Sequence, residues 1–187
     1  MKIFHQKLRI VPIAVLAVGM STGFFAASAA DQMPDSEQVS ELLSQVKTHA
    51  FQLKEDAGTL ESFTHNAGLS WHSHAAVLTR MKEDINEAGR DLTKLEEAKK
   101  SASPWQKTAI ERIQPLLKEL AGNTEQAINY GNENQKRLFT EPYKDYLEAN
   151  ADLSSELAST ISDFVDYGNT KERLDALERK LELPATR

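Results

Sequence analysis

Residues 36–65 read SEQVSELLSQVKTHAFQLKEDAGTLESFTH, and apolar side chains recur there at nearly every third or fourth position. Because an α-helix turns once in about 3.6 residues, this spacing gathers the apolar side chains into one stripe along a helix. The stripe consists of Val39, Leu42, Leu43, Val46, Ala50, Leu53, Ala57, Leu60 and Phe63. The sequence therefore predicts a helix of about 30 residues that is buried on one side.

The same spacing recurs in three more long stretches separated by short breaks. The predicted helices cover about residues 36–65, 70–100, 104–134 and 141–167, with a short fifth helix at about 170–182. Short connections place consecutive long helices side by side in opposite directions. No stretch shows the alternation that predicts strands. The predicted fold class is all-α: an up-down-up-down four-helix bundle with a short C-terminal helix.

Two interruptions are expected within these stretches. Pro115 lies inside the third predicted helix, where its missing amide hydrogen predicts a kink. Gly168-Asn169 follows the fourth stripe and is typical of a helix end. Beyond it, we expect the amphipathic segment with Leu174, Leu177 and Leu181 either to fold back on the bundle or to contact another chain.

The N-terminal region has the order of features that is typical of a secretory signal peptide. Lys2, Lys7 and Arg9 precede an uncharged stretch that ends in the small residues Ala27-Ser28-Ala29. We therefore expect a cleaved signal peptide over residues 1–29, a helical bundle domain over residues 30–187, and export to the periplasm or the extracellular space. The alternative is an uncleaved inner-membrane anchor through residues 10–30.

Composition excludes several classes of function. The chain has no cysteine, which excludes disulfides, c-type haem attachment and thiolate zinc sites. Its net charge of −6 argues against a nucleic-acid partner. Because no Gly-x-Ser-x-Gly, Walker, Gly-x-Gly-x-x-Gly or His-Glu-x-x-His motif is present, we expect neither an enzyme nor a bound cofactor.

A group of histidines near the break between the first two predicted helices is the candidate metal site. Its members are His65, His72, His74 and Glu61. Imidazole and carboxylate groups are common ligands of transition metals. However, His72 and His74 lie about 200° apart around a helix, so we expect His74 to point inward and His72 outward. The sequence therefore predicts that these four side chains do not converge on one ion. No histidine has the Glu-x-x-His spacing of di-iron bundles.

A small-ligand site at the same end is the alternative interpretation. Up-down-up-down topology brings the first and third interhelical turns together, so residues far apart in the sequence become neighbours. The candidate ligand-binding residues are Trp71, Tyr143 and Glu141. Aromatic walls with a few polar groups are typical of small-molecule pockets.

Two dipeptides resemble part of a known motif. Leu78-Thr79 and Leu92-Thr93 are similar to the first half of the Leu-Thr-x-x-Gln motif in the periplasmic stress-protein family related to Spy and CpxP, but both lack the glutamine. The resemblance implies only the analogy of a periplasmic stress-type chaperone. We expect an exported helical-bundle protein with a non-enzymatic binding or structural role in the cell envelope. Its partner would be an unidentified protein or small ligand. We expect the protein to be a monomer or homodimer, and to have no membrane span after cleavage of the signal peptide.

The order of features in residues 1–29 predicts the mature N-terminus. Signal peptidase cleaves after small side chains, so the mature chain should begin at Ala30 or Asp31. Mass spectrometry of the protein from its native compartment measures this end. Intact residues 1–29 on a membrane-bound form would favour the anchor.

Overall fold

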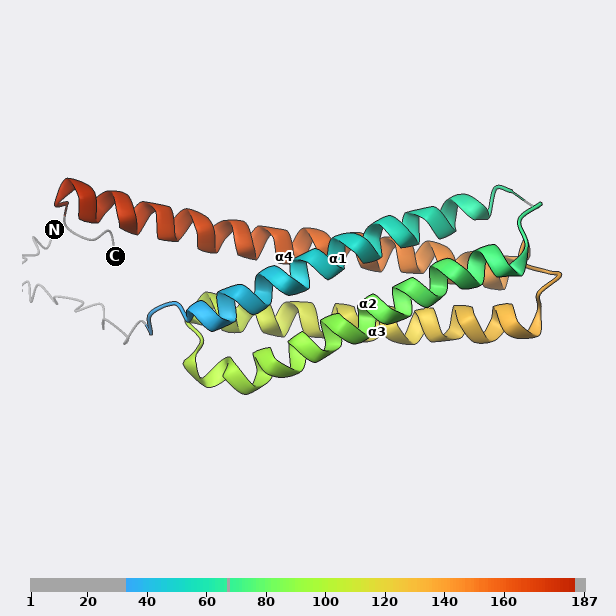
Figure 1. Cartoon of the computed structure of the whole chain (residues 1–187), viewed down its shortest axis with the longest axis horizontal. Coiled ribbons are helices and arrows are strands. Elements are labelled where there is room, and N and C mark those ends of the chain that lie inside the picture. The colour runs from blue at the N-terminus through green and yellow to red at the C-terminus, as the bar shows by residue number, and fades with distance from the viewer. Residues whose placement is uncertain (1–32, 67, 184–187) are drawn as a thin grey trace, which may run out of the picture. The chain divides into compact units, whose positions relative to one another are not determined.

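The computed structural model describes residues 33–66 and 68–183, so the predicted signal peptide and the alternative anchor lie outside the described residues. The described chain is all-helical and contains no strand (Figure 1). Its elements are α1 (Glu37–Phe63), α2 (Trp71–Ala98), the short 3₁₀-helix η1 (Lys99–Ser101), α3 (Pro104–Glu133) and α4 (Glu141–Leu181).

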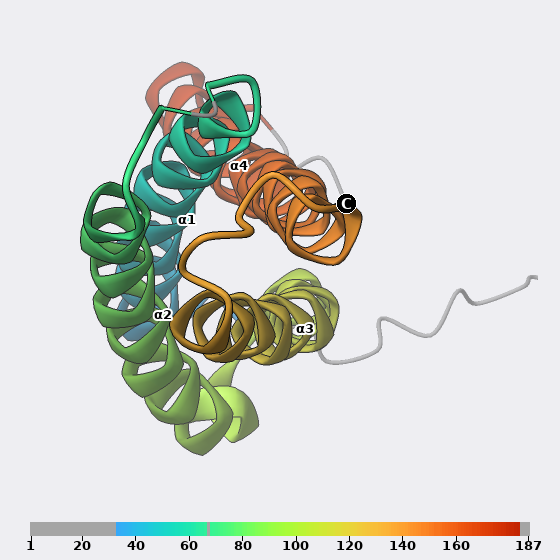
Figure 2. The ribbon, with the colours of Figure 1, turned by 90° about the vertical axis from the view of Figure 1, so that its right-hand side faces the viewer.

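The four long helices form a bundle in which successive helices run in opposite directions (Figure 1). α1 packs against α2 and α4, and α3 packs against α4 and α2 (Figure 2). The predicted four-helix packing is confirmed. Among the described residues, no helix is both long and apolar enough to cross a membrane.

The core is built from the stripes that the spacing predicts. All the apolar residues of the first stripe are buried except Phe63, which is half-buried against the core. The buried series of α4 likewise runs through Leu157, Ile161 and Val165. Burying one large aliphatic side chain stabilises the folded state by about 1.5–3 kcal/mol, so these stripes make the main contribution to stability.

The separate short C-terminal helix is a wrong prediction, because α4 continues through Gly168 and Asn169 to Leu181 without a break. A glycine ends a helix when it adopts a positive φ, and no glycine in the described chain does so. Gly168 instead provides room for a ring: a Cβ there would lie 2.7 Å from Cη2 of Trp105. Glu182 has the left-handed conformation, with φ of 55°, and α4 ends there.

α3 is also continuous, through both Pro115 and Gly122. Pro115 is exposed, so its ring lies on the solvent side of the helix. Near the C-terminal end of α3, Gly131 lies directly under the ring of Trp71, which begins α2. Both tryptophans thus pack against a glycine of a neighbouring helix, one near each end of the bundle.

One buried glutamine connects the starts of α1 and α3. Gln106 Oε1 accepts hydrogen bonds from the backbone amides of Ser36 and Ser103, each at 3.0 Å. Its Nε2 donates to the Ser36 carbonyl at 2.9 Å and to Ser40 Oγ at 3.0 Å. All four hydrogen bonds that an amide side chain can readily form are therefore present, which offsets the cost of burying it.

A helical glycine that lies under an aromatic ring and one that faces open space should respond oppositely to substitution by alanine. Gly131→Ala should destabilise the protein by about 1–3 kcal/mol, because the new methyl group overlaps the Trp71 ring. Gly89→Ala in α2 meets no atom within 4 Å and should stabilise it by about 0.5–1 kcal/mol through helix propensity. Urea unfolding measures both changes. The same sign for both would contradict the close packing of Trp71 on Gly131.

Candidate functional site

The predicted metal residues do not share one environment. Glu61, His65 and His72 are exposed, whereas His74 is only 2% exposed, so His74 points inward and His72 outward as the stripe predicts. Among the residues that the structure describes, no group of three or more His, Cys, Asp or Glu side chains is arranged to hold a metal ion.

His74 lies in a buried aromatic cluster that joins α2 to α4. Its Nδ1 is 3.1 Å from the hydroxyl of Tyr143. Phe63 meets the imidazole edge-on at a centroid distance of 5.1 Å, and Tyr130 stacks on Tyr143 at 6.0 Å. Burial lowers the pKa of His74 and raises the pKa of Tyr143, so both groups are held in their neutral forms. This pair is suited to packing and to specifying the contact between the two helices.

The predicted ligand residues are likewise divided between core and surface. Trp71 and Tyr143 are buried against each other, with their rings edge-on at 6.5 Å. Glu141 is exposed and pairs with Lys144 at 3.6 Å. A cavity of about 210 Å³ does open at this end, but His74, Phe63 and Phe139 are among its lining residues, whereas Trp71 and Tyr143 are not.

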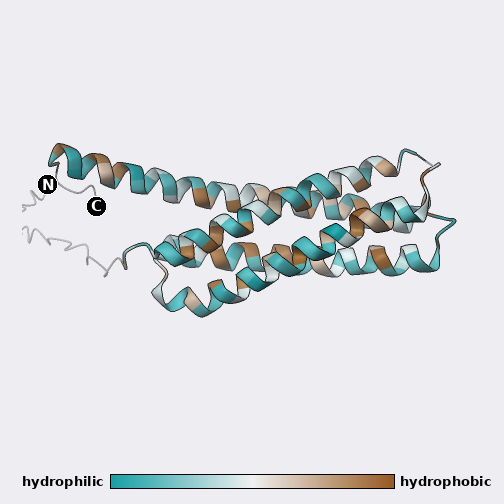
Figure 3. Cartoon of the chain, viewed as in Figure 1, coloured by the Kyte–Doolittle hydropathy of each residue, from teal (hydrophilic) through white to brown (hydrophobic). Residues whose placement is uncertain are grey.

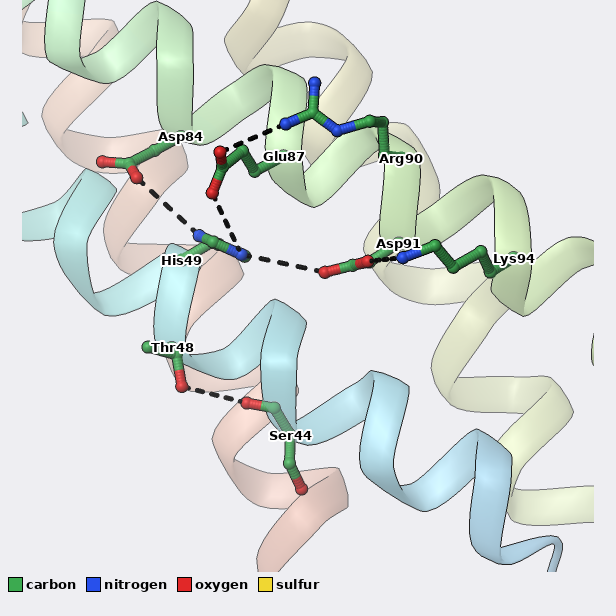
Figure 4. Close-up of polar contacts among 8 residues, drawn as sticks. All are labelled: Ser44, Thr48, His49, Asp84, Glu87, Arg90, Asp91 and Lys94. Atoms are coloured by element: carbon green, nitrogen blue, oxygen red, sulfur yellow. Dashed lines mark hydrogen bonds and ion pairs between the residues drawn. The ribbon is translucent and has the colours of Figure 1, made fainter.

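A second histidine, which the sequence reasoning did not select, faces three carboxylates across the contact between α1 and α2 (Figure 4). His49 Nδ1 is 3.7 Å from Asp84 Oδ1, and Nε2 is 3.7 Å from Asp91 Oδ2 and 3.9 Å from Glu87 Oε2. These separations are longer than hydrogen bonds and become ion pairs when the imidazole is protonated. We call this group the His49 cluster.

The other oxygens of two of these carboxylates are occupied by bases of α2 itself. Glu87 Oε1 accepts from Arg90 at 3.1 Å, and Asp91 Oδ1 accepts from Lys94 at 2.7 Å. Burial raises the pKa of Asp84, and the nearby Asp56 and Glu87 add to this effect, although His49 opposes it. The cluster is thus a partly buried group of acidic and basic side chains at the contact between α1 and α2.

Register explains how the sequence could have revealed this cluster. Positions 49 and 87 are equally distant from position 68, in the turn between α1 and α2, and antiparallel helices bring such positions together. The same rule pairs Asp56 with Arg80, whose Nη2 and Nε donate to the carboxylate at 2.7 and 3.1 Å.

At the opposite end of the bundle, α4 extends beyond the other helices (Figure 1). We call residues 168–183 the overhang. Asp35, just before α1, accepts hydrogen bonds from Trp105 Nε1 at 2.7 Å and from Lys171 Nζ at 2.8 Å. Burial opposes ionisation of Asp35, but the hydrogen bonds from Lys171 and Trp105 outweigh it and lower the pKa of the carboxyl. An ionised Asp35 therefore fixes the start of the overhang.

The overhang turns a polar side toward the bundle. The core-facing series of α4, at positions 161, 165 and 168, continues with helical spacing at Glu172, Asp175 and Arg179. Together with Pro34, Asp35 and Glu37, these three residues line a groove of about 500 Å³.

The apolar side of the overhang points away from the bundle. Leu174 follows the buried Val165 by nine residues, which is about two and a half turns and therefore the opposite side of the helix. Leu174, Leu177 and Leu181 are 48%, 47% and 61% exposed, and we call them the leucine stripe. Brown bands alternate with teal ones at the far end of α4 (Figure 3).

Comparison with protein-family models, with curated proteins and with solved structures found no match.

The neutral, buried state of His74 predicts a stability loss at low pH. Because the folded state holds the pKa below the ordinary 6.5, the unfolded chain binds the proton more readily once pH falls below that value. The stability that neutral His74 contributes is thus present above pH 6.5 and is lost on acidification. The free energy of unfolding falls by at most about 1.4 kcal/mol per pH unit through this group. His74→Gln should reduce this slope, as measured by urea unfolding between pH 7 and about pH 5.

His72→Gln is the matched control, since His72 is exposed two residues away. It should leave the slope unchanged. A slope that is equally steep in wild type and His74→Gln would show that the acid sensitivity arises elsewhere.

Proposed function

We propose that this protein is an exported, non-enzymatic binding protein of the cell envelope that holds another helical protein through the leucine stripe. The observation that carries the proposal is that the apolar side of α4 changes direction along the length of the helix. Within the bundle this side faces the core, but in the overhang it faces away from the chain's own helices. A stripe of leucines at helical spacing is the usual recognition surface for a second amphipathic helix.

The export part of the proposal depends on the N-terminal sequence. The basic residues, the uncharged stretch and Ala27-Ser28-Ala29 support secretion. The non-enzymatic part is supported by the position of the strongest chemical candidates: His74 and Tyr143 bond to each other inside the core, where they specify packing.

A photo-reactive amino acid at Leu177 tests this function in cells. It should form one major adduct with another polypeptide, because Leu177 is central in the leucine stripe. The same amino acid at Lys118, which is exposed on α3 beside the groove between α2 and α3, should form none. Gel mobility and peptide sequencing of the adduct measure the result.

The variant Leu174→Gln/Leu181→Gln should remove the adduct while changing the free energy of unfolding by less than about 0.5 kcal/mol per substitution. A spread of many adducts would instead favour the stress-type chaperone. No adduct at Leu177, or equal adducts at Leu177 and Lys118, would contradict the proposed function.

A further inference from the structure

A groove lined by aromatic rings runs along the outer contact between α3 and α4, which pack side by side (Figure 2). Its volume is about 350 Å³, within the range of about 300–1,000 Å³ that is usual for small-molecule sites. Its main lining residues follow helical steps of three and four residues along the adjoining sides of the two helices: Trp105, Thr108 and Arg112 of α3, and Asp163, Phe164 and Tyr167 of α4. We call this surface the aromatic groove.

Two of the rings in the aromatic groove are held in place by the bundle itself. Trp105 Nε1 donates to Asp35 at 2.7 Å, and the indole ring lies over Gly168. Tyr167 meets the Trp105 ring edge to face, at a centroid distance of 5.6 Å and an interplanar angle of 67°. Tyr167 is still 54% exposed, so it leaves apolar surface open to a ligand. Because these walls are already ordered, a ligand loses little free energy in arranging them.

The polar side chains of the aromatic groove keep unused hydrogen-bonding groups. The guanidinium of Arg112 lies over the Phe164 ring, 5.9 Å from its centroid, and forms no ion pair with any residue that the structure describes. Asp163 is likewise exposed and unpaired within residues 33–66 and 68–183. Thr108 donates its hydroxyl to the Pro104 carbonyl at 3.0 Å and keeps lone pairs that can accept. The groove therefore offers N–H donors beside carboxylate and hydroxyl acceptors.

This combination favours a neutral polyhydroxylated ligand over a charged aromatic one. The opposite charges of Arg112 and Asp163 leave the groove without a net attraction for an ion of either sign, and ion pairs at exposed positions contribute little to binding. A sugar ring has one face of C–H groups that packs on an aromatic ring, and hydroxyls around its edge that both donate and accept. The aromatic groove supplies a partner for each of these groups.

We propose that the aromatic groove is a binding site for a neutral mono- or disaccharide. The C–H face of the sugar packs on Tyr167 beside Trp105, while Arg112 donates to its hydroxyls and Asp163 accepts from them. This site goes beyond the proposed function, because it does not use the leucine stripe. Since the groove is open to solvent, the dissociation constant is expected to be about millimolar.

The two tryptophans of the chain provide a reporter and its internal control. Trp105 lies in the aromatic groove, whereas Trp71 is buried near the other end of the bundle. In a nitrogen-15 correlated NMR spectrum of the purified protein, the two indole N–H groups give separate signals. Titration with cellobiose, maltose or N,N′-diacetylchitobiose should shift the Trp105 signal saturably for at least one of the three sugars, and should leave the Trp71 signal in place.

Two substitutions connect this binding to the aromatic groove. Tyr167→Ala should raise the dissociation constant by about fivefold, because a stacking surface is lost. Arg112→Gln should raise it by about threefold, because the guanidinium donors are lost. The matched controls are Phe51→Ala, at an exposed ring of α1, and Lys118→Gln, at an exposed base of α3, and both should leave the constant unchanged. An unchanged Trp71 signal shows that each variant is folded.

Three results would each overturn the proposal: no saturable shift with any of the three disaccharides well above the millimolar range, equal shifts of both tryptophans, or binding that survives Tyr167→Ala unchanged. Phenylacetate, phenethylamine and phenylalanine serve as anionic, cationic and zwitterionic aromatic probes. A Trp105 shift with one of these and with no disaccharide would also overturn it, in favour of a charged aromatic ligand. The photo-adduct at Leu177 reports on the proposed function separately, so that failure of one leaves the other standing.

Discussion

The packing of Trp105 on Gly168 is the contact on which the direction of the leucine stripe depends. Only a residue without a side chain allows the indole ring to lie this close to the α4 backbone. The indole Nε1 also donates to Asp35, whose other oxygen holds Lys171. One ring therefore connects α3, the segment before α1, and α4, and it fixes which side of α4 faces the bundle. The outward direction of the leucines is a consequence of this rotation.

The helices and their buried sides could be predicted from the sequence because the 3–4 spacing is long and regular in each stretch. The end of the fourth helix could not, because Gly168-Asn169 has the local preference of a stop, and this preference is overridden by the Trp105 ring and the Lys171–Asp35 bond. The change of apolar side after Val165 was visible in the sequence. We predicted a new helix after Gly168-Asn169, whereas α4 is a single helix that continues to Leu181.

The candidate sites divide in the same way. The inward position of His74 could be predicted, since it depends only on the stripe of its own helix. The His49 cluster depends on the register between two helices, which the turn at position 68 determines and which no single-helix pattern contains. The polar core shows a further contrast. Gln106 has a partner for each of its hydrogen-bonding groups, whereas Asn150 accepts from Asn123 and Thr124 but leaves its buried Nδ2 without a partner in the described chain.

The bundle is closed by its first and last helices. α1 packs along α4, and the bond between Asp35 and Lys171 joins residues that are 136 positions apart. During synthesis the chain grows from its N-terminus, so the side of α1 that packs on α4 has no partner until α4 has been synthesised. The hairpin of α1 and α2 can form early, since its contacts are local, but cooperative folding must wait for the final helix. A chain built in this way therefore cannot close its bundle before α4 has been synthesised.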